Sequence, residues 1–83
     1  MSKFDGKKIL VTGGTGSIGS EIVRQLLRRK PKNILVYARD DSAIFFLKRE
    51  IDDERVEFII GDIRDTKALR RVFNQGIDIV VHA

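Results

Sequence analysis

Apolar runs and helical periodicities alternate along the whole chain. Apolar runs rich in β-branched residues predict strands at residues 8–12, 33–38, 56–60 and 77–82. The first two are continuous apolar runs of the kind that suits strands buried on both faces of a sheet. Between these runs, apolar side chains recur at helical spacing and polar side chains fall opposite them. The predicted helices extend from 17 to 30, from caps at 40–42 to about 52, and from a cap at 65 to about 74. The pattern therefore predicts the order βαβαβαβ.

The short connections between these elements indicate how the strands pair. Alternating strands and helices imply a parallel sheet with right-handed crossovers. We therefore expect an α/β fold with strand order 3-2-1-4. The first two helices should cover one face of the sheet, and the third helix the other. No linker or repeat beyond the strand–helix unit is present, so residues 1–83 are predicted to form a single domain.

A glycine-rich loop, TGGTGSIG (12–19), connects the first predicted strand to the first helix. It fits two templates. Gly14, Gly16 and Gly19 give G-x-G-x-x-G, whereas Gly13, Gly16 and Gly19 give G-x-x-G-x-x-G. Between a strand and a helix of a βαβ unit, such a loop is typical of a dinucleotide-binding site. A loop that serves only as a tight turn is the alternative.

Each part of this loop has an expected role. The first glycine, Gly13 or Gly14, lets the chain turn off the strand. Gly16 lets a pyrophosphate approach the backbone, and Gly19 lets the helix pack closely. The expected phosphate contacts are the backbone N–H groups of Ser17 and Ile18 and the hydroxyls of Thr15 and Ser17. A nucleoside triphosphatase loop is not expected, because no Lys-Ser/Thr pair follows the last glycine.

The end of the second strand predicts which dinucleotide binds. In dinucleotide folds an acid there binds the 2′-hydroxyl of NAD, whereas an arginine accommodates the 2′-phosphate of NADP. Arg39 lies about 20 residues after the last glycine, and Asp40 follows it. We predict NADP with Arg39 at its 2′-phosphate, and NAD with Asp40 as the ribose acid is the alternative. Arg39 could instead be solvated, and Asp40 could only cap the next helix.

The segment GDIRD (61–65) follows the third strand at the same edge of the sheet. Asp62 is predicted to accept a hydrogen bond from the adenine amino group, and Ile63 to offer backbone and apolar contact. Asp65 is predicted to cap the third helix. We interpret His82 as a strand-end residue rather than a ligand or base, and Tyr37 as part of the core.

Composition narrows the function classes. The 83 residues are 42% hydrophobic and 34% charged, which is a globular balance. The chain has no cysteine and one histidine, so we expect neither a disulfide nor a metal site. No apolar run approaches the roughly 20 residues that cross a bilayer, and the polar residues 1–8 are no secretory signal. We therefore predict a cytoplasmic protein that does not contact membranes.

The net charge of +4 suits an anionic ligand such as phosphate. Many of the basic residues cluster at 24–32 and 67–71, where cations favour the C-terminal ends of helices. A nucleic-acid patch is the alternative, but no aromatic or glycine-rich RNA signature accompanies the clusters. No nucleic-acid partner is therefore predicted.

Three segments resemble the extended branch of the short-chain dehydrogenase/reductase superfamily: 12–19, 61–65 and 79–83. Within that branch, VYARD (36–40) and the ending His82-Ala83 resemble nucleotide-sugar dehydratases of polysaccharide biosynthesis, of the UDP-N-acetylglucosamine 4,6-dehydratase type. The resemblance covers nearly the whole chain. It implies half of an NAD(P)-binding Rossmann fold, often with NADP, and a cofactor contact at Ala83.

The chain departs from that superfamily in its catalytic residues. Members carry a Tyr-x-x-x-Lys pair and a Ser or Thr partner well beyond the fourth strand. Here the single tyrosine, Tyr37, is followed four residues later by Asp41, so no catalytic residue is predicted. We expect the truncated, adenosine-binding half of a nucleotide-sugar dehydratase or epimerase, inactive alone. A free-standing nucleotide-binding or sensing module and a fragment that binds nothing are the alternatives.

The fourth predicted strand suggests an assembly. In the order 3-2-1-4 it pairs only with the first strand, and it is apolar apart from Asp78 and His82. An unpaired apolar edge recruits another chain. We therefore predict a homodimer in which two fourth strands pair antiparallel about a two-fold axis, giving an eight-stranded sheet.

Overall fold

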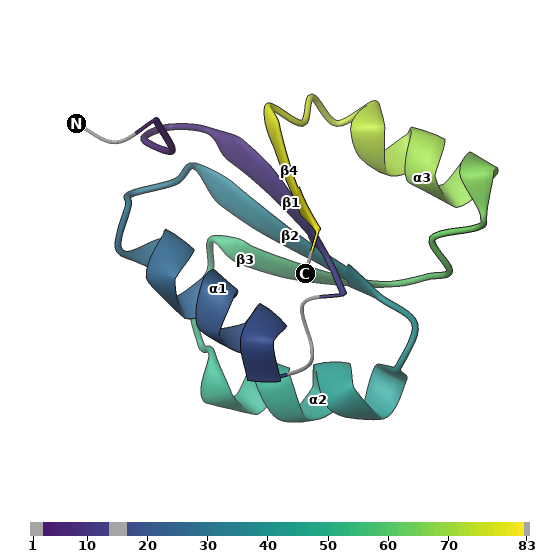
Figure 1. Ribbon diagram of the computed structural model, residues 1–83, viewed down its shortest axis with the longest axis horizontal. Helices are drawn as coiled ribbons and strands as arrows, with labels where there is room; N and C mark the ends of the chain where they lie inside the picture. Colours follow the sequence, from purple (N-terminus) through teal and green to yellow (C-terminus); the bar gives the residue numbers. More distant parts are fainter. Residues whose placement is uncertain (1–2, 14–16, 83) are drawn as a thin grey trace.

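The computed structural model describes residues 3–13 and 17–82, which form one sheet with helices on both sides (Figure 1). Within these residues the strands are β1 (Lys8–Thr12), β2 (Asn33–Ala38), β3 (Val56–Ile60) and β4 (Ile79–His82). The helices are α1 (Ser17–Leu27), α2 (Asp41–Glu50) and α3 (Thr66–Phe73). All strand pairs are parallel and the order is β3-β2-β1-β4. The predicted α/β fold and strand order are confirmed.

Two apolar clusters hold the helices to opposite faces of the sheet. On one face, Ile9 and Val11 of β1 pack with Val23 of α1 and Leu47 of α2. On the other face, Leu10 packs with residues of β2 and with α3. The strand period of two residues produces this division, because neighbouring side chains point to opposite faces. The predicted arrangement, with α1 and α2 together and α3 opposite, is confirmed (Figure 1).

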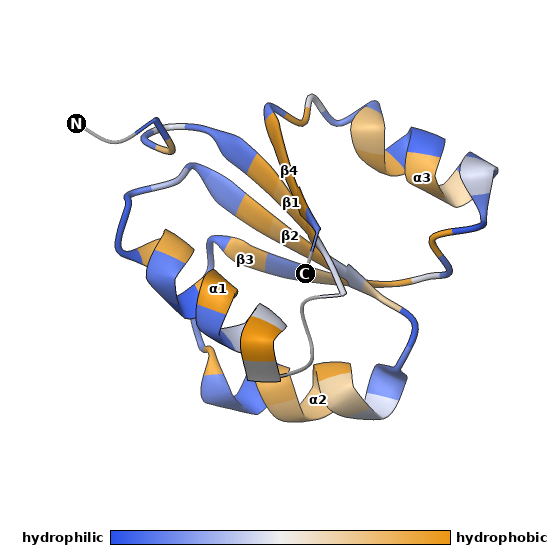
Figure 2. Ribbon diagram, viewed as in Figure 1, coloured by the Kyte–Doolittle hydropathy of each residue, from blue (hydrophilic) through white to orange (hydrophobic). Residues whose placement is uncertain are grey.

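The central strands carry the core. Every residue of β1 and β2 after the first is buried, whereas β3 and β4 are only half-buried. The expectation that the first two runs are buried on both faces is confirmed. Ile60 of β3 and Val80 of β4 are 58% and 50% exposed. Figure 2 shows hydrophobic residues along the middle of the strands and hydrophilic ones in many of the turns.

Helix α1 ends at Leu27, three residues before the predicted end. The N–H groups of Arg28 and Arg29 donate to the carbonyls of Gln25 and Leu26, three residues back, which tightens the last turn. Lys30 then adopts a left-handed conformation, with φ of 55°. The helix therefore stops three residues before Lys30, which directly precedes Pro31.

Strand β4 begins at Ile79, two residues later than predicted. The Asp78 carboxylate accepts a hydrogen bond from the Lys8 N–H (2.9 Å), and the Asp78 N–H donates to the Lys8 carbonyl (2.8 Å). A side chain thus replaces one backbone partner, and the regular ladder starts only after it. Ile77 packs instead against the cluster on the α3 face.

Two aspartates begin the second and third helices. Asp40 and Asp65 accept hydrogen bonds from the N–H groups of Ala43 and Ala68, each at 3.1 Å. Such caps satisfy N–H groups that lack partners within a helix. The predicted cap at Asp65 is confirmed. Within the described ranges, none of the helices is long and apolar enough to cross a membrane.

Candidate functional site

A pocket of about 290 Å³ opens at the carboxyl edge of the sheet. Its lining comes from the ends of the four strands and the turns after them: Thr12, Gly13, Tyr37, Ala38, Arg39, Asp40, Gly61, Ile63 and His82. The chain order reverses between β1 and β4, and open parallel sheets bind ligands at the carboxyl edge at this point. The volume is at the lower end of the ligand-pocket range, roughly 300–1,000 Å³.

Gly13 turns the chain off β1. Its φ of 71° lies in the left-handed region, which costs other residues about 1–2 kcal/mol. Its N–H donates to the Tyr37 carbonyl at 3.0 Å. Gly13 thus has the conformation expected of the first glycine in the template G-x-x-G-x-x-G. Its role is the turn itself, because its N–H already has a partner.

The rest of the loop leads into α1. The predicted contacts at Gly14, Thr15 and Gly16 lie outside the described residues, as does Ala83. Ser17 and Ile18 lie in the first turn of α1, as predicted, and the Ile18 side chain is 75% exposed. Gly19 follows them and is buried. The N–H groups of this first turn lack partners within the helix, which is the feature that favours an anion there.

Arg39 and Asp40 line the pocket after β2. The Arg39 side chain is 68% exposed, and its Nε lies 3.8 Å from Oδ2 of Asp62. The Asp40 carboxylate caps α2 through its Oδ1 atom. The capping role that the sequence allowed for Asp40 is therefore present. Its alternative role toward a ribose stays a prediction.

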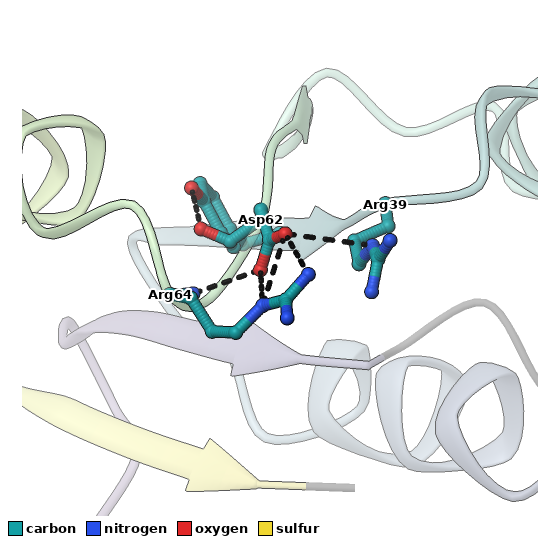
Figure 3. A network of polar contacts seen from close by, with 4 residues as sticks. Arg39, Asp62 and Arg64 are labelled. Carbon is teal, nitrogen blue, oxygen red and sulfur yellow. Dashed lines mark hydrogen bonds and ion pairs between the residues drawn. The ribbon is translucent and has the colours of Figure 1, made fainter.

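Asp62 lies between two guanidinium groups, as Figure 3 shows. Its Oδ1 accepts from the Arg64 backbone N–H at 2.9 Å, and its Oδ2 accepts from the Arg64 Nη2 at 2.9 Å. The Arg64 guanidinium, and then the Arg64 N–H, lower the pKa of Asp62 from 3.8 to about 2. Asp62 is thus a carboxylate at neutral pH, and Arg39 and Arg64 together exceed its charge.

Tyr37 and Gly61 meet at the end of β3. The Tyr37 side chain is 2% exposed, and its hydroxyl donates to the Asp62 carbonyl at 2.9 Å. A Cβ on Gly61 would lie 2.3 Å from the Tyr37 hydroxyl oxygen, so glycine is required for this approach. The Gly61 N–H donates to the Ala38 carbonyl at 2.8 Å. The interpretation of Tyr37 as core is confirmed, and it also borders the pocket.

Thr12 and His82 join the ends of β1 and β4. Thr12 Oγ1 and His82 Nδ1 lie 2.6 Å apart in a hydrogen bond. His82 is the last residue of β4, as interpreted, and it lines the pocket as well. Sequence reasoning did not place five lining residues at the site: Thr12, Tyr37, Ala38, Gly61 and His82. The rule that ligands meet the carboxyl ends of parallel strands could have found them, because each lies at or just after such an end.

Asp40, Asp62 and His82 do not form a metal centre. Among residues 3–13 and 17–82, no group of three or more histidine or acidic side chains is placed to hold a metal ion. The chemistry that these residues support is recognition of an anionic ligand by backbone N–H groups, arginines and an apolar surface at Ile63.

The topology and the pocket are those of a Rossmann fold. The similar proteins place it in the extended short-chain dehydrogenase/reductase superfamily. The chain belongs to the family described as polysaccharide biosynthesis protein, whose model matches residues 9–83. The family resemblance that the sequence suggested is confirmed.

Curated relatives match most of this chain. An uncharacterized membrane protein, MJ1061, of Methanocaldococcus jannaschii is 46% identical over 80 residues, or 96% of this chain and 24% of the relative. An inverting UDP-N-acetylglucosamine 4,6-dehydratase of Campylobacter jejuni is 40% identical, with 96% and 24% covered. A UDP-glucose 4-epimerase of Neisseria meningitidis is 44% identical, with 92% and 23% covered. The chain spans about a quarter of the length of these relatives.

A solved structure agrees with the fold. The enzyme WbmF of Bordetella bronchiseptica, in complex with NAD⁺ and UDP, superposes with a TM-score of 0.81 at 29% identity. The match covers 100% of this chain and 24% of WbmF.

Proposed function

We propose that the carboxyl edge binds the adenosine and pyrophosphate half of a nicotinamide dinucleotide. The observation that carries the proposal is the pocket at the switch point between β1 and β4, with Gly13 at its turn and Ile63 and Arg39 in its lining. The residues fit such a group, because an apolar side chain, Ile63, and an exposed cation, Arg39, line one opening. The loop that begins at Gly13 leads to the first turn of α1, where an anion is favoured. The complex of WbmF with NAD⁺ and UDP supports the proposal.

Within this proposal, NADP is the preferred dinucleotide. Arg39 is exposed at the rim, where a guanidinium can make two hydrogen bonds to a 2′-phosphate. One oxygen of the competing acid, Asp40, already caps α2. Arg64 offsets the charge of Asp62, which would otherwise repel a phosphate. In the proposal, Ile63 contacts the adenine face, and Asp62 accepts from the adenine amino group.

Titration calorimetry with NADP, NAD, 2′,5′-ADP and AMP tests this proposal. We expect all four to bind and NADP to bind more tightly than NAD. Gly16→Val should abolish binding, because a branched side chain enters the space of the pyrophosphate. The matched control is Gln25→Val, on an exposed position of α1, which should bind as the wild type does. If no adenine nucleotide binds at millimolar concentration, the proposal is wrong.

For the whole protein we propose a nucleotide-sugar dehydratase or epimerase of polysaccharide biosynthesis. The dehydratase and epimerase relatives support this reaction class. A bound nicotinamide would supply transient oxidation of a sugar carbon, which in the dehydratase (a lyase) precedes loss of water. The residues described here would hold and orient that cofactor. A Tyr-x-x-x-Lys pair encoded downstream of residue 83 would support this class, and a continuing frame without one would contradict it.

We also propose that two copies pair through β4. Among the described residues, β4 is bonded to β1 alone, and Val80 and Phe73 are 50% and 47% exposed. Sedimentation should give the mass of a dimer, and Val80→Lys should shift the equilibrium toward the monomer. Ile60→Lys, on the opposite edge strand, is the matched control that should stay dimeric. A mass near 9.5 kDa at high micromolar concentration would contradict the pairing. The cytoplasmic location stays a prediction.

A further inference from the structure

The Tyr37 side chain spans the distance between the core and the pocket. Its ring packs in the cluster with Leu10, Leu35 and Val72, and only 2% of the residue is exposed. Its hydroxyl emerges at the carboxyl edge and donates to the Asp62 carbonyl at 2.9 Å. Phenylalanine would satisfy the packing, so the hydroxyl serves something other than the core.

The backbone of Tyr37 contacts a second loop. Its carbonyl accepts the hydrogen bond from Gly13 N–H at 3.0 Å. In the sheet, Tyr37 lies beside Thr12 on one side and Ile59 on the other. One residue of β2 therefore bonds to the loop after β1 through its carbonyl and to the loop after β3 through its hydroxyl. These are the two loops to which the proposed function assigns the pyrophosphate and the adenine.

The fit between Tyr37 and the loop after β3 is close. A Cβ on Gly61 would lie 2.3 Å from the hydroxyl oxygen and 2.6 Å from the ring carbon that carries it. The backbone at Gly61 therefore lies directly against the phenol, and the phenol determines how near to the sheet this loop can lie. The next two residues are Asp62 and Ile63, so their placement depends on the same contact.

The Tyr37 hydroxyl keeps its proton and so remains a hydrogen-bond donor. Burial, followed by the charges of Asp65 and Asp62, raises the pKa of Tyr37 above its ordinary value of 10.0. The group is therefore protonated throughout the physiological range. The Asp62 carbonyl accepts from it, and the Asp62 carboxylate accepts separately from Arg64. The Tyr37 hydroxyl and the Asp65 N–H thus hold the backbone of Asp62. Arg64 holds its side chain.

We propose that Tyr37 is a positioning residue whose hydroxyl fixes the backbone position of the adenine-recognition loop, residues 61–64. This inference rests on the proposed function and extends it, because it attributes the fixed conformation of that loop to a buried residue of the neighbouring strand. In this proposal Tyr37 holds Asp62 and Ile63 where they meet an adenine, and it acts through its hydroxyl bond to the loop backbone.

The test compares wild type with Tyr37→Phe in the 83-residue chain. Amide hydrogen exchange at residues 62–64 should accelerate about 2- to 10-fold, the equivalent of one net hydrogen bond, with β1 and β2 unchanged. AMP affinity should fall by a similar factor, whereas the affinity for inorganic pyrophosphate should not. Thr12→Val is the matched control for exchange, because it removes another buried hydroxyl bond at this edge and should leave residues 62–64 unchanged.

The outcomes separate this inference from the proposed function. Unchanged exchange at residues 62–64 in Tyr37→Phe overturns the inference, whatever the ligands do. Equal AMP affinity in both proteins overturns the inference alone. An equal loss for AMP and pyrophosphate also overturns it, because that pattern indicates general damage to the fold. If the wild type binds no AMP, the proposed function fails and the assignment of an adenine loop fails with it.

Discussion

The two ends of β3 carry the same three-residue turn in different surroundings. Asp53-Glu54-Arg55 precedes the strand and Asp62-Ile63-Arg64 follows it. In each turn the arginine N–H donates to the aspartate Oδ1 at 2.9 Å. The guanidinium reaches the aspartate Oδ2 at 2.8 Å in the first turn and 2.9 Å in the second. Each arginine lowers the pKa of its aspartate to about 2.

What differs is the neighbouring strand. At the amino edge, β2 contributes only the Ile34 N–H, which donates to the Arg55 carbonyl at 2.8 Å. At the carboxyl edge, the β2 side contributes the hydroxyl of Tyr37 and the guanidinium of Arg39. The middle residue there is apolar and lines the pocket. The turn is thus a local structure, and the residues brought beside it by the sheet make it part of a site.

The largest contrast between the two edges should come from their glycines. Gly61→Ala places a Cβ against the buried Tyr37 phenol, which should cost about 1–3 kcal/mol and abolish binding of 2′,5′-ADP. Gly76→Ala, before β4 at the amino edge, meets no atom within 4 Å but has φ of 86°. It should cost about 1–2 kcal/mol and bind normally. Thermal melts and calorimetry measure both, and equal loss of binding would remove the contrast.

A smaller difference in ligand affinity should distinguish substitution of Arg39 from substitution of Arg55. Arg39→Ala should weaken NADP binding about 10- to 100-fold, since a hydrogen bond to a charged group contributes about 1.5–3 kcal/mol. NAD, which lacks the 2′-phosphate, should bind almost as before. Arg55→Ala at the amino edge should change neither affinity. Titration calorimetry provides the comparison, and an equal loss of NADP and NAD binding would refute the role of Arg39.

The two carboxylates should respond separately to loss of their arginines. Arg64→Gln should raise the pKa of Asp62 from about 2 toward 3.8, because the guanidinium that favours the carboxylate is gone. The pKa of Asp53 should stay at about 2 in that variant. Arg55→Gln should give the reverse. Carbon-13 NMR titration of the side-chain carboxyls measures both pKa values. A change of both pKa values in one variant would show that the turns are coupled.

The smallest effect concerns acid stability at the amino edge. The folded pKa of Asp53, about 2, lies below its ordinary 3.8. Its stabilisation is therefore complete above pH 3.8 and lost as the pH falls through 2. Asp53→Asn should lower the unfolding free energy by roughly 0.5 kcal/mol at neutral pH. Melts from pH 7 to 2 should show the difference closing, and a constant difference would contradict this assignment.

Much of the fold was predictable because its signals are local. The β-branched runs and the helical periodicities gave the elements, and right-handed crossovers gave the strand order. The errors lie where one residue overrides its neighbours. Lys30 ends α1 early by adopting a positive φ, and the Asp78 side chain delays β4 by replacing a ladder partner. Neither conformation shows in an apolar pattern.

The site was predictable only as far as a motif describes it. Gly13, Arg39 and Ile63 were found from spacing, and the structure places all three in the pocket lining. Tyr37 was taken as core alone, because its link to residue 62 depends on the register of β2 beside β3. Register is a pairing between distant segments, so a single sequence does not display it. The roles of Thr15, Gly16 and Ala83 stay predictions.

The bonds between β1 and β4 also bear on how the chain folds during synthesis. Lys8 and Thr12 are each bonded to a residue 70 positions later, at the two ends of the same strand pair. Strands β1, β2 and β3 can meet as soon as they leave the ribosome, but β1 gains its second neighbour only after residue 82 emerges. Until then β1 is an edge, and a nascent chain has a three-stranded sheet at most. We expect chains that end before residue 77 to show weak amide protection in β1 and firmer protection in β2, and equal protection in both would contradict this order.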